Sequence, residues 1–311
     1  MPDLLVALML SLAVAVGWMG VIRLTRSVRH TSLTAAAAWA IWFQVTLTVT
    51  TIATLAKGRV PPGILDQLWY LTAVSALCPF VAVLGARRGR LLEWGLFIVL
   101  PLIVVLEWPA LAQWKPCWNG QRLELEMPTV IGYFLVLTMS LGSYLVSMTR
   151  FSAAVICWAH AWGAAILLLN NRLTDSIAAL SPIRTGSHIY VAIALQILFW
   201  LAMNWAVNVR SRFDGWDRVW YDFRGWFGGV WAARIMARIN EVALREQWPW
   251  RLTHDGWEPT SHEQQQVRPP IDDPRVDHTV RWLLKPFVDP EWIDERLNAA
   301  LPTSQTPDTP C

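Results

Sequence analysis

Residues 4–22 read LLVALMLSLAVAVGWMGVI and include no charged side chain. A helix of about 20 mostly apolar residues is long enough to cross the hydrocarbon core of a bilayer. Secretory signal peptides share this pattern, but Asp3 is the only charge before the stretch and no small-residue cleavage site follows it. We therefore interpret residues 4–22 as a retained membrane-spanning helix.

Six further stretches of the same kind occur in the first two thirds of the chain. The third span contains Pro79 and the fourth contains Pro101, so both are expected to be kinked. The sequence thus predicts an all-α fold whose transmembrane helical domain, residues 1–209, has about seven spans. The six further stretches cover residues 33–55, 68–86, 91–111, 129–148, 151–169 and 189–209.

The remaining residues, 210–311, have the composition of a soluble domain. They contain 13 Lys and Arg and 16 Asp and Glu, whereas residues 1–209 contain 13 and 7. The whole chain is 54% apolar and 16% charged, below the roughly 25% charged residues of soluble proteins. This shift predicts a domain boundary near residue 209 and a soluble tail after it.

The charges of the loops predict an orientation. Odd-numbered loops and the start of the tail carry 11 Lys and Arg, and even-numbered loops carry 6. Positively charged loops stay on the cytoplasmic side. We therefore expect a multi-pass protein of the cell (inner) membrane with its N-terminus outside and a cytoplasmic tail. Trp114 and Trp118 flank Lys115 in the fourth loop, where we expect them to lie on the outer leaflet.

His160 lies near the centre of the sixth span, and Cys157, Gly163 and Ala164 share its helix face. Because these neighbours are small, we expect another helix to pack closely there. One interpretation is a haem ligand, a metal ligand or a proton relay. We favour the other, a histidine hydrogen-bonded to a neighbouring helix, because no second histidine lies inside the spans.

Uncharged polar residues form stripes on several spans. Such stripes line a polar path, or they supply hydrogen bonds between helices worth about 0.6 kcal/mol each. We favour the second interpretation, because transport sites usually recruit a charge at the membrane midplane. The seventh span carries Gln196, Trp200, Asn204 and Asn208 at steps of four, the second carries Gln44, Thr48 and Thr51, and the fifth carries Ser140, Ser143 and Ser147.

Glu93 and Glu107 are the two acids inside the predicted spans. Fourteen residues of helix separate them by about 21 Å and leave them almost on one face. That distance is too long for two carboxyl groups that act on one substrate. A proton path with a carboxylate at each end would fit the spacing. We favour interfacial acids that reach water.

Motifs for chemistry are missing from the sequence. There is no GxGxxG, Walker, HExxH or GxSxG motif, and the four cysteines include no CxxC pair. We therefore predict no catalytic residue, no metal site, no cofactor apart from the haem alternative at His160, and no nucleic-acid partner.

The tail begins with an expected amphipathic helix over residues 216–247. Apolar and aromatic side chains recur along it at steps of three or four and form a stripe. The stripe indicates either an interfacial helix on the membrane surface or one side of a packed core, and both interpretations stay open. Gly225, Gly228 and Gly229 predict a break or kink in its middle. The aromatic part of the stripe consists of Trp216, Trp220, Phe223, Phe227 and Trp231.

The tail as a whole is expected to be small and mainly helical, with a linker and two short helices after residue 247. Residues 256–273 are polar and contain prolines, which predicts a linker. An Asp-Pro pair precedes each of two expected helices, 274–285 and 290–300, as helix cap and first residue. Residues 302–311 are rich in proline and are expected to be disordered.

Three functions fit these patterns. The favoured one is a non-catalytic subunit or scaffold of a membrane complex, whose tail docks a protein partner, with a homo-oligomer as the alternative assembly. The second is a transporter of a small solute or proton along the seventh span and His160. The third is a haem or quinone protein that uses His160. The lipid bilayer is the one partner common to all three.

Overall fold

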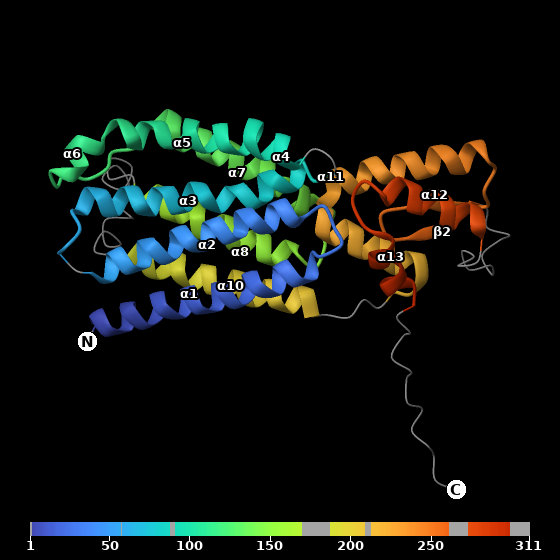
Figure 1. Ribbon diagram of the computed structural model, residues 1–311, viewed down its shortest axis with the longest axis horizontal. Helices are drawn as coiled ribbons and strands as arrows, with labels where there is room; N and C mark the ends of the chain where they lie inside the picture. The colour runs from blue at the N-terminus through green and yellow to red at the C-terminus, as the bar shows by residue number, and fades with distance from the viewer. Residues whose placement is uncertain are drawn as a thin grey trace, which may run out of the picture. The chain divides into compact units, whose positions relative to one another are not determined.

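The computed structural model describes residues 2–56, 58–87, 91–169, 187–208, 213–260 and 273–298, and most of them are helical. The chain forms two compact units, Met1–Asn208 and Val209–Cys311, called unit 1 and unit 2 below. Their boundary lies one residue from the position expected from composition. Figure 1 gives the course of the chain.

Unit 1 is a bundle of long helices, and each of the seven apolar stretches forms one of them. The largest shift is at α3, which begins at Pro62 rather than at residue 68 because its first turns, although polar, are buried in the bundle. The elements are α1 (Pro2–Ser27), α2 (Thr34–Leu55), α3 (Pro62–Leu84), α4 (Leu91–Trp94), the π-helical turn η1 (Gly95–Val99), α5 (Leu100–Ala112), α6 (Trp114–Trp118), α7 (Met127–Ser147), α8 (Ser152–Leu169) and α10 (Ser187–Asn208).

Five of these helical segments are long and apolar enough to cross a membrane: those in α1, α2, α3, Gly95–Ala112 and α7. In α8 and α10 the described apolar parts are shorter, Ser152–Leu167 and Ile193–Val207. Among the described residues the structure thus contains five candidate spans, where the sequence predicts about seven.

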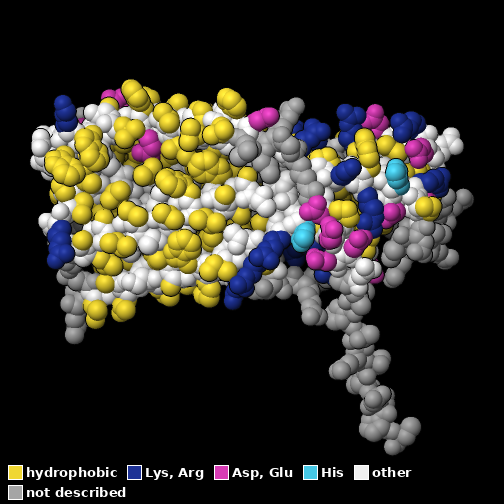
Figure 2. Space-filling model, viewed as in Figure 1, with side chains coloured by type: hydrophobic (Ala, Val, Ile, Leu, Met, Phe, Trp, Pro, Cys, Tyr) yellow, Lys and Arg dark blue, Asp and Glu magenta, His cyan; other side chains and the backbone are white. Residues whose placement is uncertain are grey.

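Helix α3 lies at the centre of unit 1 and packs against α2, α5, α6, α7 and α8. Helix α1 packs against α2 and α10, α10 against α8, and α8 against α7. The outer surface of this bundle is covered with apolar side chains, as Figure 2 shows for one face. Polar side chains inside and apolar ones outside are the arrangement that a lipid environment favours.

The fourth predicted span is interrupted by a change of helix type. The N–H of Leu100 donates to Gly95 O across the π-helical turn, and Pro101 follows directly. Proline has no backbone N–H to donate to the helix. The π-helical turn before it contains one residue more than an α-helical turn. The expected distortion near Pro101 is therefore present. Pro79 also lies inside its helix, α3.

Unit 2 consists of α11 (Gly215–Arg245), the strands β1 (Trp250–Leu252) and β2 (Trp257–Pro259), and the helices α12 (Pro274–Leu284) and α13 (Pro290–Leu297). The strands pair antiparallel, with Leu252 opposite Trp257. The described part of unit 2 is mainly helical, as expected, and the hairpin corrects only the start of the linker expected from residue 256. The strands form because the buried tryptophans that begin them have partners on other elements, which the local sequence does not reveal.

The expected break in α11 is confirmed, because Gly228 has non-helical angles of φ 76° and ψ 176°. A positive φ of this kind is accessible to glycine at little cost. The helices predicted at 274–285 and 290–300 also form, with slightly earlier ends. The rest of the linker, residues 261–272, and the expected disorder at 302–311 lie outside the described residues.

The aromatic stripe of α11 points into the core of unit 2. Phe223 and Phe227 stack with ring centroids 4.6 Å apart, and Phe287 contacts both edge-on at 5.5 Å. Trp216 and Trp220 are buried, and Trp231 is half-buried and lies 4.9 Å from Phe287. Of the two interpretations of this helix, the packed core is the one observed. A helix lying on a membrane would need these rings on its outer side.

Candidate functional site

The first turns of α3 hold a network of buried polar groups, which we call the α3 hub (Gly63, Asp66, Gln67 and Tyr70). Gln67 Nε2 donates to Ala110 O at 2.6 Å, and Tyr70 Oη donates to Leu106 O at 2.6 Å. These two bonds fasten α3 to α5. The α3 hub residues recur at steps of three or four, as residues on one helix face do. This spacing could have predicted that α3 begins before residue 68.

Asp66 is buried and forms an ion pair with Arg122. Its Oδ2 lies 2.8 Å from Arg122 Nε and accepts the N–H of Leu123 at 3.2 Å. The sequence places both charges in loops that face water, whereas the structure buries Asp66 inside the bundle. The pair joins the start of α3 to the connection between α6 and α7.

The residues from 113 to 126 are held firmly against the α3 hub. Gln113 bonds to Glu124 in both directions, with Nε2 to the carbonyl oxygen at 2.7 Å and the Glu124 N–H to Oε1 at 3.1 Å. A Cβ atom on Gly63 would lie 1.9 Å from Gln121 O, so these backbones touch. Burial raises the pKa of the Cys117 thiol, which favours its protonated form.

The two acids of the fourth span have different environments. Glu107 is only 7% exposed, and its Oε1 has no hydrogen-bond partner among the described residues, whereas Glu93 is exposed. The expectation that both acids reach water at the interface is therefore wrong for Glu107. An α-helix turns about 100° per residue, so the extra residue of the π-helical turn moves the two side chains from about 40° to about 140° apart.

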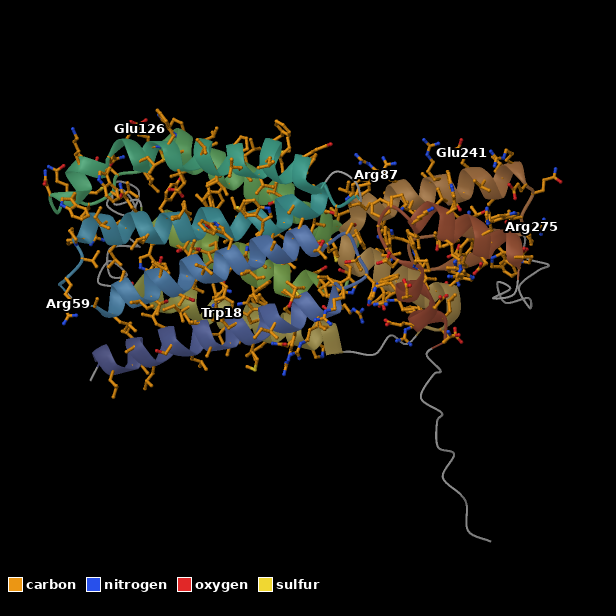
Figure 3. The ribbon with its side chains drawn as sticks, viewed as in Figure 1. Trp18, Arg59, Arg87, Glu126, Glu241 and Arg275 are labelled. Carbon is orange, nitrogen blue, oxygen red and sulfur yellow. The ribbon has the colours of Figure 1, made fainter. Side chains whose placement is uncertain are left out.

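Gln44 fastens α2 to α1 rather than lining an open path. Its Nε2 donates to Val14 O at 3.1 Å, and one turn further Trp18 Nε1 donates to Thr48 Oγ1 at 3.2 Å (Trp18 is labelled in Figure 3). A Cβ on Gly17 would lie 2.3 Å from Gln44 Oε1. The two helices thus touch at a glycine.

The polar stripe of α10 is divided among several partners. Gln196 Oε1 accepts from Trp162 Nε1 at 2.9 Å, and Asn204 Oδ1 accepts from Arg23 at 2.9 Å. Between them, Trp200 packs on Gly20, where a Cβ would lie 2.2 Å from its ring. The stripe therefore joins α10 to α8 and α1. The side chain of Asn208 lies outside the described residues.

An aromatic cluster that the sequence reasoning missed fills the space between α2, α3, α8 and α10. Trp158 is its centre, with ring centroids 4.8 Å from Phe43, 4.2 Å from Phe199 and 5.5 Å from Phe80. Aromatic residues in the middle of a span, away from the interface, were the available signal. Several polar atoms around the cluster have no partner among the described residues: Gln44 Oε1, Gln196 Nε2, Trp158 Nε1 and Trp200 Nε1.

His160 is exposed on the outside of unit 1, and its Nδ1 lies 2.8 Å from Ile156 O of its own helix. The close packing expected on this face occurs at Gly163, which is buried and where a Cβ would lie 3.1 Å from the ring of Phe134, but it does not include His160. The small residues sit at the edge of the contact with α7, and His160 lies beyond it. The structure does not bring His160 together with the α10 stripe, since His160 is exposed whereas Gln196 and Trp200 are buried.

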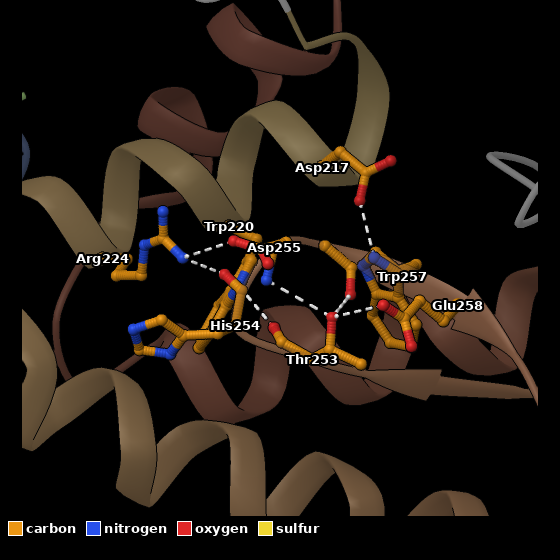
Figure 4. A network of polar contacts seen from close by, with 9 residues as sticks. Asp217, Trp220, Arg224, Thr253, His254, Asp255, Trp257 and Glu258 are labelled. Carbon is orange, nitrogen blue, oxygen red and sulfur yellow. Dashed lines mark hydrogen bonds and ion pairs between the residues drawn. The ribbon is translucent and has the colours of Figure 1, made fainter. Parts of the chain in front are cut away.

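In unit 2, one face of α11 holds the hairpin loop (Figure 4). Asp217 Oδ1 accepts the N–H of Trp257 at 2.8 Å, and Trp220 Nε1 donates to Thr253 O at 3.0 Å. Arg224, which is buried, donates to the carbonyl oxygen of His254. Burial raises the pKa of Asp217 despite the bond from Trp257. These bonds fix the hairpin loop on α11.

Helix α12 presents an exposed face, which we call the α12 face (Arg275, His278, Trp282 and Lys285). Trp282 is 66% exposed, whereas every other tryptophan of unit 2 is buried or half-buried. Arg275 pairs with Asp273 at 3.1 Å. Lys285 has no ion pair with a described residue, so the face carries free positive charge beside an exposed indole.

Comparison with protein-family models, with curated proteins and with solved structures finds no match to this chain.

Proposed function

We propose that this chain is a seven-span membrane protein that serves as a non-catalytic subunit or scaffold and holds a protein partner through unit 2. In this proposal α8 and α10 are the sixth and seventh spans, the N-terminus is outside, and unit 2 is a soluble cytoplasmic tail. Arg87 lies at one end of unit 1, and Arg59 and Glu126 lie at the other (Figure 3), which fits the division into odd and even loops. The excess of positive charge in the odd loops supports a cytoplasmic unit 2.

The buried polar groups of unit 1 support an anchoring role. Ser140 and Ser147 bond to carbonyl oxygens of their own helix, and the glutamines of α2, α3 and α10 bond to neighbouring helices. Hydrogen bonds of this kind hold membrane helices together.

The α12 face is the observation that carries the proposal of a docked partner. Tryptophan and arginine, both present on this face, are enriched at the energetic centres of protein interfaces. The other eight tryptophans of unit 2 are less exposed than Trp282, so its indole is available to fill a pocket on a partner. The free charge of Lys285 favours an acidic rim around that pocket. We therefore assign the partner as a protein with an acidic, apolar-centred surface.

A photo-crosslinking residue placed at position 282 in the full chain, in its own membranes, tests this proposal. We expect one crosslinked protein product. Native mass spectrometry of the chain that keeps Trp282 is expected to show the same partner at fixed stoichiometry, and Trp282→Ala is expected to lose it. The matched control is the same residue at position 244, because Leu244 is exposed on α11 and lies off the α12 face. Equal products at both positions, or only a monomer or homo-oligomer, would contradict the proposal.

A second candidate function, proton-coupled transport, has one specific observation in its favour. A carboxyl group inside a membrane span is costly and is often functional, and Glu107 is buried there with an unpartnered oxygen. In sealed vesicles that contain the purified protein, a solute-driven pH change abolished by Glu107→Gln and kept by Glu93→Gln would support transport. The absence of any solute-driven pH change would remove this candidate.

A further inference from the structure

The short helix α6 forms an exposed platform beside the end of α5. Trp114, Lys115, Trp118 and Asn119 line a shallow pocket of ≈ 320 Å³ on it. Trp114 and Trp118 are 49% and 58% exposed, and their ring centroids lie 5.6 Å apart. The pocket therefore has two aromatic walls with an ammonium group and an amide beside them.

The platform is rigid because its inner side is fastened to the α3 hub. Cys117 points inward and is buried against the backbone of Gly63. The bonds between Gln113 and Glu124 close the connection that follows, and Arg122 is engaged with Asp66. Aromatic walls held in this way lose little conformational entropy when they bind a ligand.

The pocket offers donors for an anion. Neither indole N–H, of Trp114 or Trp118, forms a hydrogen bond with a described residue, and Lys115 forms no ion pair with one. An ammonium group and an indole N–H donate hydrogen bonds and accept none, so Asn119 supplies the one acceptor side chain of the lining. This donor set matches a phosphate group.

The position of the pocket points to a lipid as the source of that phosphate. The apolar segment Gly95–Ala112 ends just before α6, and Trp108 and Leu111 continue its exposed apolar side up to the platform. Lys115 follows Ala112 by three residues, so it lies within about 10 Å of the end of this segment, which is the depth of the headgroups if the segment spans the bilayer. Tryptophan and lysine are both favoured at this depth.

We propose that the α6 platform binds the phosphate headgroup of an anionic phospholipid. Lys115 and the two indole N–H groups contact the phosphate, and Trp108 and Leu111 contact the upper part of the acyl chains. The proposal rests on the membrane insertion of Gly95–Ala112, and it is independent of any partner bound by unit 2.

Native mass spectrometry of the full chain in detergent, titrated with phosphatidylglycerol, tests the site. We expect Lys115→Gln to weaken retention of one lipid about fivefold, the effect of one basic residue near an anionic lipid surface. Trp114→Leu with Trp118→Leu is expected to weaken it at least as much. The matched control is Arg59→Gln, an exposed cation at the same end of unit 1 without a tryptophan pair (Figure 3).

Further arms of the experiment separate the alternatives. If Lys115→Gln and Arg59→Gln weaken retention of phosphatidylglycerol equally, the lipid is held by general charge attraction, and the proposed site is overturned. Equal retention of phosphatidylcholine, or full displacement of the lipid by inorganic phosphate, would overturn the assignment to an anionic lipid. The thermal stability of each variant shows that it is folded, and we expect no change because the altered side chains are exposed. These results do not depend on the crosslinking at position 282.

Discussion

Replacing Gly63 by alanine tests the contact between the α3 hub and the platform. The new Cβ would lie 1.9 Å from Gln121 O, 2.6 Å from Cys117 Cα and 2.8 Å from Cys117 Cβ. Two of these atoms belong to the backbone, so α3 or the connection after α6 must shift. Overpacking of this kind costs about 1–3 kcal/mol. Alanine in place of glycine in a helix returns about 0.5–1 kcal/mol, so the net loss lies between about 0 and 2.5 kcal/mol, with about 1–2 kcal/mol as its central range.

The assay is thermal unfolding of the purified full chain in detergent. For a unit of this size, a loss of about 1–2 kcal/mol corresponds to a lower Tm by roughly 2–8 °C. A second readout is the rate at which Cys117 is alkylated in the folded protein, located by peptide mass mapping. Because Cys117 is buried against Gly63, we expect Gly63→Ala to increase that rate.

Two other glycines provide matched controls, because a Cβ on Gly132 or Gly142 of α7 would meet nothing within 4 Å. Gly132→Ala and Gly142→Ala should leave the Tm unchanged or raise it slightly. The reasoning is refuted if Gly63→Ala melts like the wild type with unchanged Cys117 alkylation. It is equally refuted if the controls lose as much stability as Gly63→Ala.

Three further predictions concern polar contacts. Arg122→Gln should lower the Tm more than the double variant that also carries Asp66→Asn, because the single change leaves a buried carboxylate without its partner; equal values would contradict this. Asp217 has a raised pKa in the folded protein, so ionising it costs stability as pH rises above its ordinary value of about 4. Asp217→Asn keeps an acceptor for Trp257 and should flatten that decline, measured as Tm against pH; an unchanged slope would refute it. Asn240→Ala removes two bonds of 2.8 Å to the backbone of β1 and should cost about 1–3 kcal/mol, with faster amide exchange in the hairpin but not in α13.

Local patterns were enough to predict the helices of unit 1, since a long apolar stretch leaves the backbone no water to bond and favours the helix. They also predicted α12 and α13, because an Asp-Pro pair acts through residues next to it, and Asp273 Oδ1 does accept the N–H of Arg275 at 2.9 Å. The break at Gly228 was also predictable from the local sequence, because it depends on the backbone freedom of the glycine itself.

The direction in which a side chain points was predicted less well. Glu107 was expected to reach water but is buried, and His160 was expected to pack against another helix but is exposed. For Glu107 the cause is one extra residue in the π-helical turn, which rotates everything after it. His160 is exposed although its helix α8 packs against α3, α7 and α10.

The amino-acid sequence by itself therefore determined the positions of the helices, the change from an apolar to a charged unit near residue 209, and the glycine break in α11. Only the tertiary structure decided that the α11 stripe forms a core, that Trp250 and Trp257 begin paired strands, and that Asp66 is buried beside Arg122. The physical reason is the range of the interactions. Helix formation and capping act within a few residues, whereas burial depends on partners that are 30 or more positions away, as Asp217 and Trp257 are.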